Sequence, residues 1–373
     1  MINTLKFFNS LKKNKIDFFT GVPDSLLKEL CYCISDNTTK KQHIINSNEG
    51  SCIGLSIGYN LATNKIPFVY FQNSGLGNII NPHVSLAHES VFKIPILLFV
   101  GWRGEPNKKD EPQHLFQGKI TEDLLKILEI DYEILKTDTK ESIKQMERII
   151  NLVQEAQKPF AILVKKNSFS EYYFKQKSVK HNLKRESSIE IILNNLEQKD
   201  IIVSTTGKTS RELHEISKKN NLKNPLFYTI GGMGHSSQIA LGISNFSLKR
   251  VFCFDGDGSI IMHMGSMGII GNNSNDNYFH ILFNNGSHES VGGQPTVGKD
   301  VNFELLSKSL GYKEYFKLIS KENLSDFFEN IITSLKGPVF IEILIESSSR
   351  SDLGRPEISP IQQKFIFQKL IND

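Results

Sequence analysis

Two short segments of the chain carry acid and amide side chains at a spacing that suits a metal-bound phosphate. The first reads Gly256-Asp257-Gly258, and the second, after residues 259–283, reads Asn284-Asn285. Each follows a continuous apolar run of the kind that forms a central parallel strand. Ligands of open α/β sheets bind at the carboxyl ends of such strands. We therefore expect the two turns to converge on one cation held by Asp257 and Asn285.

The same two turns offer what a phosphate and a hard cation need. Gly256 and Gly258 let the backbone approach a phosphate closely, and Ser259 begins a predicted helix whose N-terminus favours anions. Ser287 follows the second turn and adds a backbone carbonyl to the oxygen donors, which is the ligand type that Mg²⁺ prefers. A lone Gly-Asp-Gly segment is often only a turn, so the Asn pair after the next strand carries the prediction.

The elements that must position these turns alternate between short apolar strands and helices, which predicts α/β domains with mainly parallel sheets flanked by helices. The first half predicts helices at 78–92 and 140–157. A polar, basic stretch at 167–186 reads as a linker between a domain at 1–166 and a domain at 187–373. The expected strands are 17–20, 43–45, 68–72, 96–101, 132–135, 160–164, 201–204, 227–229, 251–254, 279–283 and 339–345.

Composition excludes several classes of protein. The net charge of +4 is spread along the chain, which does not indicate a nucleic-acid-binding arm but suits anionic ligands. The four cysteines form no Cys-x-x-Cys pair, so a zinc ribbon is not supported. The N-terminus lacks an apolar signal core, and the longest apolar run, 94–100, is a buried strand rather than a membrane span. We expect a cytoplasmic protein with no nucleic-acid or membrane partner.

Further segments, read together with the two turns, resemble the thiamine-diphosphate-dependent 2-oxo acid decarboxylase family. They are 20–26 (TGVPDSL), 102–106 (WRGEP), 110–114 (DEPQH) and 231–235 (GGMGH). The resemblance implies a pyrimidine-binding domain and a pyrophosphate- and Mg²⁺-binding domain, with no middle domain. It also implies that thiamine diphosphate lies between subunits of a homodimer or a larger homo-oligomer.

The resemblance also implies an activity, the decarboxylation of 3-phosphonopyruvate to phosphonoacetaldehyde and CO₂ in phosphonate biosynthesis. The alternative substrate is sulfopyruvate or another 2-oxo acid. A rival from another class is a binding protein that keeps the fold without the chemistry, against which the presence of both turns and of Glu49 counts. A nucleotide-phosphate binder would need a Gly-x-x-x-x-Gly-Lys-Ser/Thr loop, and the sequence has none.

Glu49 precedes Gly50, Gly54 and Gly58, which share one face of a predicted helix. Such a face permits very close packing of a second helix, as at a dimer interface, although each glycine costs up to about 1 kcal/mol against alanine. Taken alone, Glu49 is an ordinary acid favourable at a helix N-terminus. By the resemblance, it is the glutamate that hydrogen-bonds N1′ of the cofactor's aminopyrimidine and promotes loss of the C2 proton.

Four more positions are assigned by the resemblance in the second domain. Met233 would lie between the two rings of the cofactor, with Gly234 and His235 beside it, and Gly207 would approach the diphosphate. The plainer interpretations are that Met233 fills the core and that Gly207 belongs to a capped helix start.

The substrate end is predicted from a long proline-containing loop and from the turn at Asp24. The loop carries Arg103, Lys109, Gln113 and His114, and suits a lid or a substrate-binding loop, or else it is only a solvated charged loop. His114 is a candidate proton donor because the ordinary histidine pKa suits work near neutrality. Asp24 and Ser25 could orient the carbonyl or relay a proton, or Asp24 could simply cap a helix.

Overall fold

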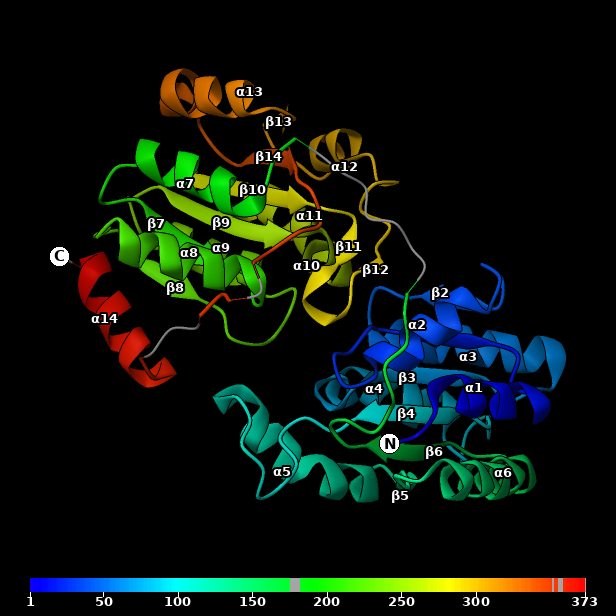
Figure 1. Ribbon diagram of the computed structural model, residues 1–373. Helices are drawn as coiled ribbons and strands as arrows, with labels where there is room; N and C mark the ends of the chain where they lie inside the picture. Colours follow the sequence, from blue (N-terminus) through cyan, green and yellow to red (C-terminus); the bar gives the residue numbers. More distant parts are fainter. Residues whose placement is uncertain (175–181, 351, 355–357, 373) are drawn as a thin grey trace. The chain divides into compact units, whose positions relative to one another are not determined.

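The computed structural model describes residues 1–174, 182–350, 352–354 and 358–372, and the chain divides into two units, Met1–Lys177 and Ser178–Asp373. Each unit is built on a six-stranded parallel sheet with helices on both faces (Figure 1). This confirms the predicted α/β fold class. Among the described residues, no helix is long and apolar enough to cross a bilayer.

The sheet of the first unit has the strand order β2-β1-β3-β4-β6-β5. One core cluster joins buried side chains of α1, α2 and α6 to one face of this sheet. The strands are β1 (Phe19–Gly21), β2 (His43–Ile45), β3 (Phe68–Gln72), β4 (Leu97–Gly101), β5 (Asp131–Ile134) and β6 (Phe160–Val164). The helices are α1 (Thr4–Lys13), α2 (Lys28–Asp36), α3 (Glu49–Thr63), η1 (Asn73–Gly75), α4 (Leu76–Pro82), η2 (His83–Ala87), α5 (Pro112–Ile127) and α6 (Thr139–Ala156).

The sheet of the second unit has the order β13-β14-β10-β9-β7-β8, with a separate β11–β12 hairpin. Alternate side chains of β9 enter two cores, Phe252 and Phe254 on one face, Val251 and Cys253 on the other. The strands are β7 (Ile201–Ser204), β8 (Leu226–Tyr228), β9 (Val251–Gly256), β10 (Tyr278–Asn284), β11 (Ser287–His288), β12 (Gln294–Pro295), β13 (Glu314–Leu318) and β14 (Val339–Leu344). The helices are α7 (Arg185–Asn195), α8 (Lys208–Lys219), α9 (Ser236–Asn245), α10 (Asp257–Met262), α11 (Gly265–Asn273), η3 (Glu289–Val291), α12 (Phe303–Ser309), α13 (Lys321–Asp326), η4 (Phe327–Ile331), η5 (Ile332–Ser334) and α14 (Pro360–Asn372).

Both sheets have the same topology. Numbered from the start of each unit, and leaving the β11–β12 hairpin aside, the strands of both lie in the order 2-1-3-4-6-5. The direction of chain progression therefore reverses between β1 and β3 in one unit and between β7 and β9 in the other. Open α/β sheets bind ligands in the crevice at such a switch point, beyond the carboxyl ends of the strands. Each unit thus has one edge where a ligand site is expected.

The structure differs from the sequence prediction in several places. The helix predicted at 78–92 is broken: α4 ends at Pro82, where a backbone donor is missing, and η2 follows. The edge strand β13 was not predicted, because its residues mix polar and apolar types. Phe169 and Leu183, inside the predicted linker, are buried in the cores of the first and second unit, while 175–181 lie outside the described residues.

Candidate functional site

The switch point of the first unit brings together two acidic residues and a glycine that follow three neighbouring strands. Asp24 follows β1, Glu49 begins α3 after β2, and Gly75 follows β3. Glu49 lies directly against the third turn, because a Cβ added to Gly75 would come within 2.5 Å of the Glu49 carboxyl carbon. Only glycine leaves room for this carboxyl group. The fold therefore places a glutamate where sheet topology predicts a ligand.

Glu49 is buried, with 5% of its surface exposed. Asn48 caps α3 by accepting from the Ser51 amide, which fixes where the helix begins. The Nδ2 of Asn78 donates to Oε2 of Glu49 at 2.7 Å. Burial raises the pKa of Glu49 above its ordinary value, and this outweighs the Asn78 bond. Glu49 is thus a carboxyl group poised to hold or exchange a proton.

The predicted glycine face of α3 is only partly used within this unit. A Cβ at Gly50 would lie 2.9 Å from the backbone oxygen of Asn78 on α4, so these two helices are in very close contact. A Cβ at Gly54 or Gly58 would meet nothing within 4 Å. Close packing inside the unit therefore requires Gly50, and packing of Gly54 and Gly58 against a second subunit stays a prediction.

Asp24 is almost completely buried, with 1% exposure. Its Oδ2 accepts from the Leu26 amide at 3.1 Å, and a Cβ at Gly101 would come within 2.1 Å of the same oxygen. Its Oδ1 has no hydrogen-bond partner among the described residues. Burial raises the pKa of Asp24 to about 6 against the opposing influence of nearby hydrogen bonds and Arg103. A buried acid with this pKa can carry a proton near neutrality.

This raised pKa predicts a pH-dependent effect of Asp24→Asn on stability. The folded pKa of about 6 lies above the ordinary 3.8, so the native protein loses stability as pH rises through this range. Asparagine does not titrate. We expect Asp24→Asn to raise the free energy of unfolding by up to about 3 kcal/mol at pH 8 and by little at pH 3.5. Urea unfolding at both pH values measures this, and an equal difference at both would contradict it.

Arg103, after β4, places its guanidinium group beside Ser25. Its Nη1 donates to Oγ of Ser25 at 3.3 Å, while its Nε donates to Asp110 at 2.9 Å and its Nη2 bonds the other carboxylate oxygen. Burial opposes ionisation of Asp110, but Arg103 and the Gly104 amide outweigh it and lower the pKa of Asp110 to about 2. Asp110 thus fixes the orientation of the Arg103 guanidinium group. Nη1 carries a second N–H group that can donate to an anion.

The loop that carries Arg103 is anchored at its base. Asn73 bonds both backbone groups of Arg103, donating to its oxygen at 2.8 Å and accepting from its nitrogen at 3.1 Å. Gly104 has φ +69°, and a Cβ there would lie 1.9 Å from the His114 backbone oxygen. Such a close approach requires glycine. The start of the loop is therefore fixed against α5.

The predicted proton donor His114 has a different charge state from the one expected. Burial, followed by the positive charge of Arg103, lowers the pKa of His114 to about 4. The expectation of an ordinary histidine pKa is therefore wrong, and the ring is neutral near pH 7. Gln113 is half-buried beside it and Lys109 is exposed. Their contact with a substrate stays a prediction.

In the second unit the two predicted turns start side by side. The strands β9 and β10 pair in parallel, with Phe283 opposite Gly256. Asp257 begins α10, two residues before the predicted start at Ser259, and is buried. The Thr296 hydroxyl donates to its Oδ2. The convergence of the turns follows from strand pairing, as the sequence predicted.

Asn285 is held on both sides of its amide group. Its Oδ1 accepts from the Ser287 amide at 2.9 Å, and its Nδ2 donates to Oε2 of Glu289 at 3.1 Å. The carbonyl-type Oδ1 keeps a second lone pair for another partner. Ser287 itself receives a hydrogen bond from the Ser347 hydroxyl at 3.1 Å.

These residues fit Mg²⁺. Burial raises the pKa of Asp257 to about 6, and no described lysine or arginine forms an ion pair with it. A Cβ at Gly256 would meet nothing within 4 Å, so open space lies beside the turn. A buried carboxylate without a cationic partner, next to an amide oxygen that keeps a second lone pair, is a donor set that Mg²⁺ takes.

A second group of predicted residues meets at the switch point between β7 and β9. The Ser259 hydroxyl accepts from Oγ1 of Thr205 at 3.0 Å and from the Gly234 amide at 3.1 Å. Gly234 has φ +88° and Gly207 has φ +92°, a conformation that favours glycine at both positions. Three loops thus converge, with backbone close to the position expected for a phosphate.

Met233 and His235, two further predicted positions, are not fully buried. Met233 is half-buried and His235 is exposed, with its ring stacked on His263 at 4.6 Å. Gly258 faces His288, whose Cε1 would lie 3.1 Å from an added Cβ. The roles assigned to Met233 and His235 stay predictions.

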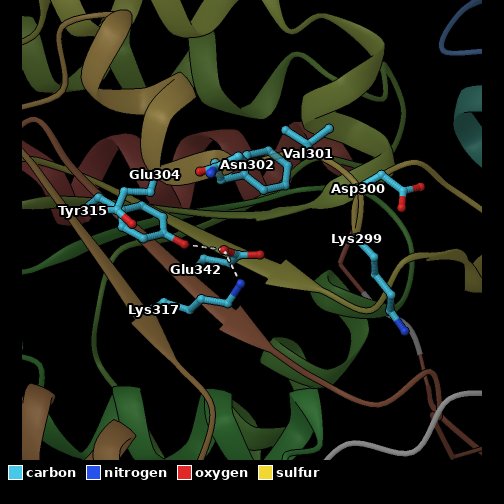
Figure 2. A pocket seen from close by; sticks show the side chains of 9 residues that line it. Lys299, Asp300, Val301, Asn302, Glu304, Tyr315, Lys317 and Glu342 are labelled. Atoms are coloured by element: carbon cyan, nitrogen blue, oxygen red, sulfur yellow. Dashed lines mark hydrogen bonds and ion pairs between the residues drawn. The ribbon is translucent and has the colours of Figure 1, made fainter.

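The Asn284–Asn285 turn is braced from the neighbouring strand by buried Glu342 on β14. Asn284 donates to Oε1 of Glu342 at 2.7 Å and to the Gly298 oxygen at 2.8 Å. Figure 2 shows Glu342 pointing at Tyr315 and Lys317 from the floor of a pocket, and both of them contact its Oε2. A Cβ at Gly298 would lie 2.6 Å from Asp257. Glu342 therefore supports the Asn284–Asn285 turn directly, and Gly298, bonded by Asn284, packs closely against Asp257.

A buried cluster of possible metal ligands lies inside the sheet, on β9 and β10 just before the two turns. Ligand atoms of Cys253, Asp255 and His280 all lie within 4.8 Å of one another. His280 Nε2 is 3.5 Å from the Asp255 carboxylate, and its Nδ1 bonds the Tyr312 hydroxyl at 2.9 Å. All three are buried in the core. This arrangement fits a polar contact between strands.

The sequence suggests only that Glu289, after the second turn, could face substrate, and sequence reasoning missed five other residues of the site: Asn73, Gly75, Asn78, Thr296 and Glu342. The segment 73–75 directly follows β3 at the switch point, so its position at a strand end was a usable signal. Glu289 lies four residues after Asn285, but its contact depends on how the turn folds back. No local pattern indicates the others.

Comparisons with known proteins agree with this geometry. The profile of the thiamine pyrophosphate enzyme N-terminal TPP-binding domain matches residues 6–127, and that of the C-terminal TPP-binding domain matches residues 205–343. The phosphonopyruvate decarboxylase of Streptomyces viridochromogenes is 29% identical over 92% of this chain and 88% of its own. The sulfopyruvate decarboxylase subunit beta of Methanocaldococcus jannaschii is 34% identical over 50% of this chain and 97% of its own.

The chain belongs to the thiamine-diphosphate-dependent 2-oxo acid decarboxylases. As a member of this family it is a carboxy-lyase with both thiamine-diphosphate-binding domains in one chain. The sulfopyruvate decarboxylase of Methanosarcina acetivorans is 25% identical over 98% of this decarboxylase and 97% of its own chain. Two domains in one chain therefore occur in relatives named for either substrate, so chain length does not identify the substrate.

Proposed function

We propose that this decarboxylase converts 3-phosphonopyruvate to phosphonoacetaldehyde and CO₂, using thiamine diphosphate and Mg²⁺, in phosphonate biosynthesis. The observation that carries the choice of substrate is the similarity to phosphonopyruvate decarboxylase over 92% of the chain. The site is compatible with it, because Arg103 directs its Nη1 end toward Ser25 beside a buried acid. A phosphonate needs such cationic donors.

The residues of the second unit would hold the cofactor's charged end. Asp257 and Asn285, with the Ser287 carbonyl, would bind Mg²⁺, and the backbone around Ser259 and Gly234 would face the diphosphate. Thiamine diphosphate, when bound, supplies the carbon nucleophile and the electron sink for decarboxylation. The second unit would therefore bind and orient the cofactor, and none of these residues would act as a proton donor.

The residues of the first unit would handle protons and substrate. Glu49 would hydrogen-bond the aminopyrimidine ring, where its raised pKa lets it hold or release a proton. Asp24, with a pKa of about 6, would relay the proton that replaces the departing CO₂. Arg103 would bind the phosphonate. His114, which is neutral near pH 7, would contact the phosphonate through a hydrogen bond and not through a positive charge.

We propose that the protein acts as a homodimer or a larger homo-oligomer, with cofactor bound between subunits. Support comes from the exposed surface of α3 and the following helices. Gly54 and Gly58 leave open space there, and apolar side chains of the same elements are exposed, namely Leu61, Ile80, Val84 and Leu86. An apolar surface next to open glycines suits a second copy of the helix pair.

The competing substrate is sulfopyruvate, for which the relatives from Methanocaldococcus jannaschii and Methanosarcina acetivorans are named. Turnover measured side by side on 3-phosphonopyruvate, sulfopyruvate and pyruvate separates the candidates. We expect the highest kcat/KM on 3-phosphonopyruvate, because the phosphonate carries more negative charge to pair with Arg103. An equal or higher kcat/KM on sulfopyruvate or pyruvate would overturn the proposed substrate.

A further inference from the structure

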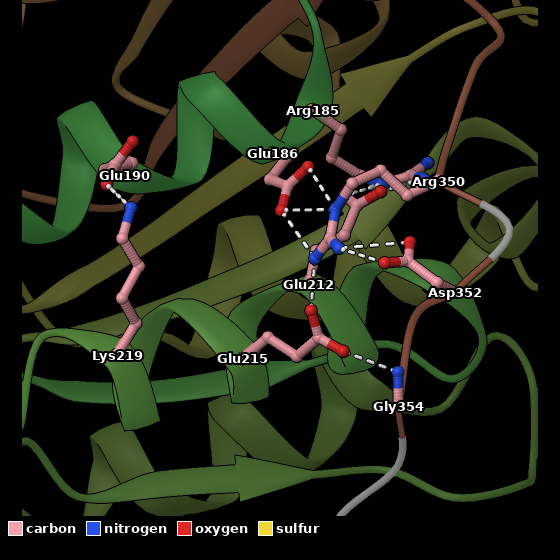
Figure 3. Close-up of polar contacts among 9 residues, drawn as sticks. All are labelled: Arg185, Glu186, Glu190, Glu212, Glu215, Lys219, Arg350, Asp352 and Gly354. Carbon is pink, nitrogen blue, oxygen red and sulfur yellow. Dashed lines mark hydrogen bonds and ion pairs between the residues drawn. The ribbon is translucent and has the colours of Figure 1, made fainter.

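A buried ion-pair network connects the first helix of the second unit to the Asn285 turn. Arg185, near the start of α7, is 5% exposed. Its Nε and Nη2 donate to the two carboxylate oxygens of Glu212 at 2.7 and 3.0 Å, and Figure 3 shows Arg185 at the start of α7. Its Nη1 donates to Oε2 of Glu289 at 2.9 Å. One guanidinium group thus bridges two acids from different elements.

Glu289 links Arg185 to Asn285. The same Oε2 that binds Arg185 also accepts from Nδ2 of Asn285 at 3.1 Å. An ionised carboxylate can only accept hydrogen bonds, so the amide nitrogen of Asn285 must face Glu289. The oxygen Oδ1 then points the other way, toward the Ser287 amide. The network therefore decides which end of the Asn285 amide group is offered to a ligand.

Two further observations indicate that a cation belongs near this network. Arg185 carries one positive charge, whereas Glu212 and Glu289 carry two negative charges, so the cluster is left negative. The second oxygen of Glu289, Oε1, is buried and has no hydrogen-bond partner among the described residues. A buried acceptor without a partner is unfavourable. A cation nearby would offset the negative charge of the cluster.

A second arginine, Arg350, also bonds several acids, but at an exposed surface. Arg350 bonds Glu186, Glu215 and Asp352 at an exposed surface, as Figure 3 shows. Its side chain is 42% exposed, against 6% for Arg185. Exposed pairs of this kind contribute little to stability. Among the described residues, Arg350 contacts Glu186 on α7, Glu215 on α8 and Asp352, and it makes no contact with the Asn285 turn.

We infer that Glu289, held by Arg185, is a positioning residue for the Mg²⁺ site: it fixes the Asn285 amide so that Oδ1 faces the metal. The inference rests on the proposed function, which makes Asn285 a metal ligand. Groups that orient metal ligands in this way typically change metal affinity by about 10- to 100-fold when they are replaced. Without the Glu289 acceptor, the Asn285 amide is free to rotate and to present its nitrogen to the cation.

The test compares two matched substitutions, Glu289→Met and Glu212→Met. Each removes one carboxylate from Arg185 and leaves the other, so each leaves a neutral pair and the protein is expected to fold. Only Glu289 contacts Asn285. The probe is Mn²⁺, followed by its electron paramagnetic resonance in the presence of saturating thiamine diphosphate. Thermal unfolding by circular dichroism shows whether each variant is folded.

We expect Glu289→Met to weaken Mn²⁺ binding at least about tenfold, and Glu212→Met to weaken it much less at a similar loss of unfolding temperature. Glu289→Gln is expected to keep most of the affinity, because its carbonyl oxygen can still accept from both Arg185 and Asn285. If Glu289→Met does not fold, Glu289→Gln and Glu289→Ala replace it in the test. Unchanged Mn²⁺ affinity of Glu289→Gln together with lost affinity of Glu289→Ala would support the same role for Glu289.

Two results would overturn the inference, and they differ from a failure of the proposed function. If Glu289→Met binds Mn²⁺ as tightly as the parent protein, or if Glu212→Met loses as much affinity, Glu289 has no specific role at the metal. If the parent protein itself binds no Mn²⁺ with thiamine diphosphate, the proposed metal site is absent, and the inference falls with it.

Discussion

Glu49→Gln is expected to reduce turnover about 100- to 10,000-fold while thiamine diphosphate still binds, because it removes a group proposed to exchange a proton with the cofactor. Glutamine has nearly the same shape, so it fits against Gly75 and can still accept from Asn78. The change also removes a buried group whose pKa is raised by burial, so the stability of the fold should not fall. The loss should therefore appear in kcat.

The measurement is CO₂ release at saturating thiamine diphosphate and Mg²⁺, together with cofactor affinity by isothermal titration. Glu155→Gln is a suitable control, because Glu155 is an exposed residue of α6 outside the described site. We expect that variant to behave like the parent protein. Near-normal turnover of Glu49→Gln would show that Glu49 does not exchange a proton with the cofactor.

Asp257→Asn is expected to weaken Mg²⁺ binding by at least about 100-fold, more than the replacement of an outer-shell residue. The carboxylate is the one charged oxygen donor in the proposed ligand set, and asparagine keeps its shape but loses its charge. Because burial raises the pKa of Asp257 to about 6, the asparagine variant should be no less stable than the parent protein at pH 8. Loss of metal and loss of fold can thus be told apart.

Mn²⁺ or Mg²⁺ titration with thiamine diphosphate present, followed by unfolding in urea at pH 8, provides both quantities. Asp300→Asn is the matched control, because Asp300 lies in the exposed loop after the Gly298 contact and no described bond joins it to the turn. An Asp257→Asn protein that binds the metal normally would show that the two turns are structural.

Strand positions were predictable where one physical signal dominates. Buried parallel strands are continuous apolar runs, and β3, β6 and β7 have the predicted bounds. The edge strand β13 lacks that signal, since one side of an edge strand meets solvent. The prediction of one α-helix over 78–92 failed because the α-helical hydrogen bonding ends at Pro82, which lacks a backbone donor, and a π-helical segment continues only to Ala87. The shared topology of the two sheets leaves no similarity that is evident in the sequence.

The site was predictable to the extent that it depends on strand ends. Asp257 and Asn285 converge because β9 and β10 are neighbours, a relation that apolar runs and spacing indicate. The contact between Glu49 and Gly75 depends on how two turns fold over the sheet edge, and no spacing shows it. The pKa of His114 could not be predicted either, because it is set by burial and by Arg103, both of which depend on tertiary structure.

The most direct test of the account is CO₂ release from 3-phosphonopyruvate by protein that has been stripped of cofactor and metal. We predict no release from the stripped protein, and full release only when thiamine diphosphate and Mg²⁺ are added together. Release without thiamine diphosphate, or no release with both added, would contradict the account.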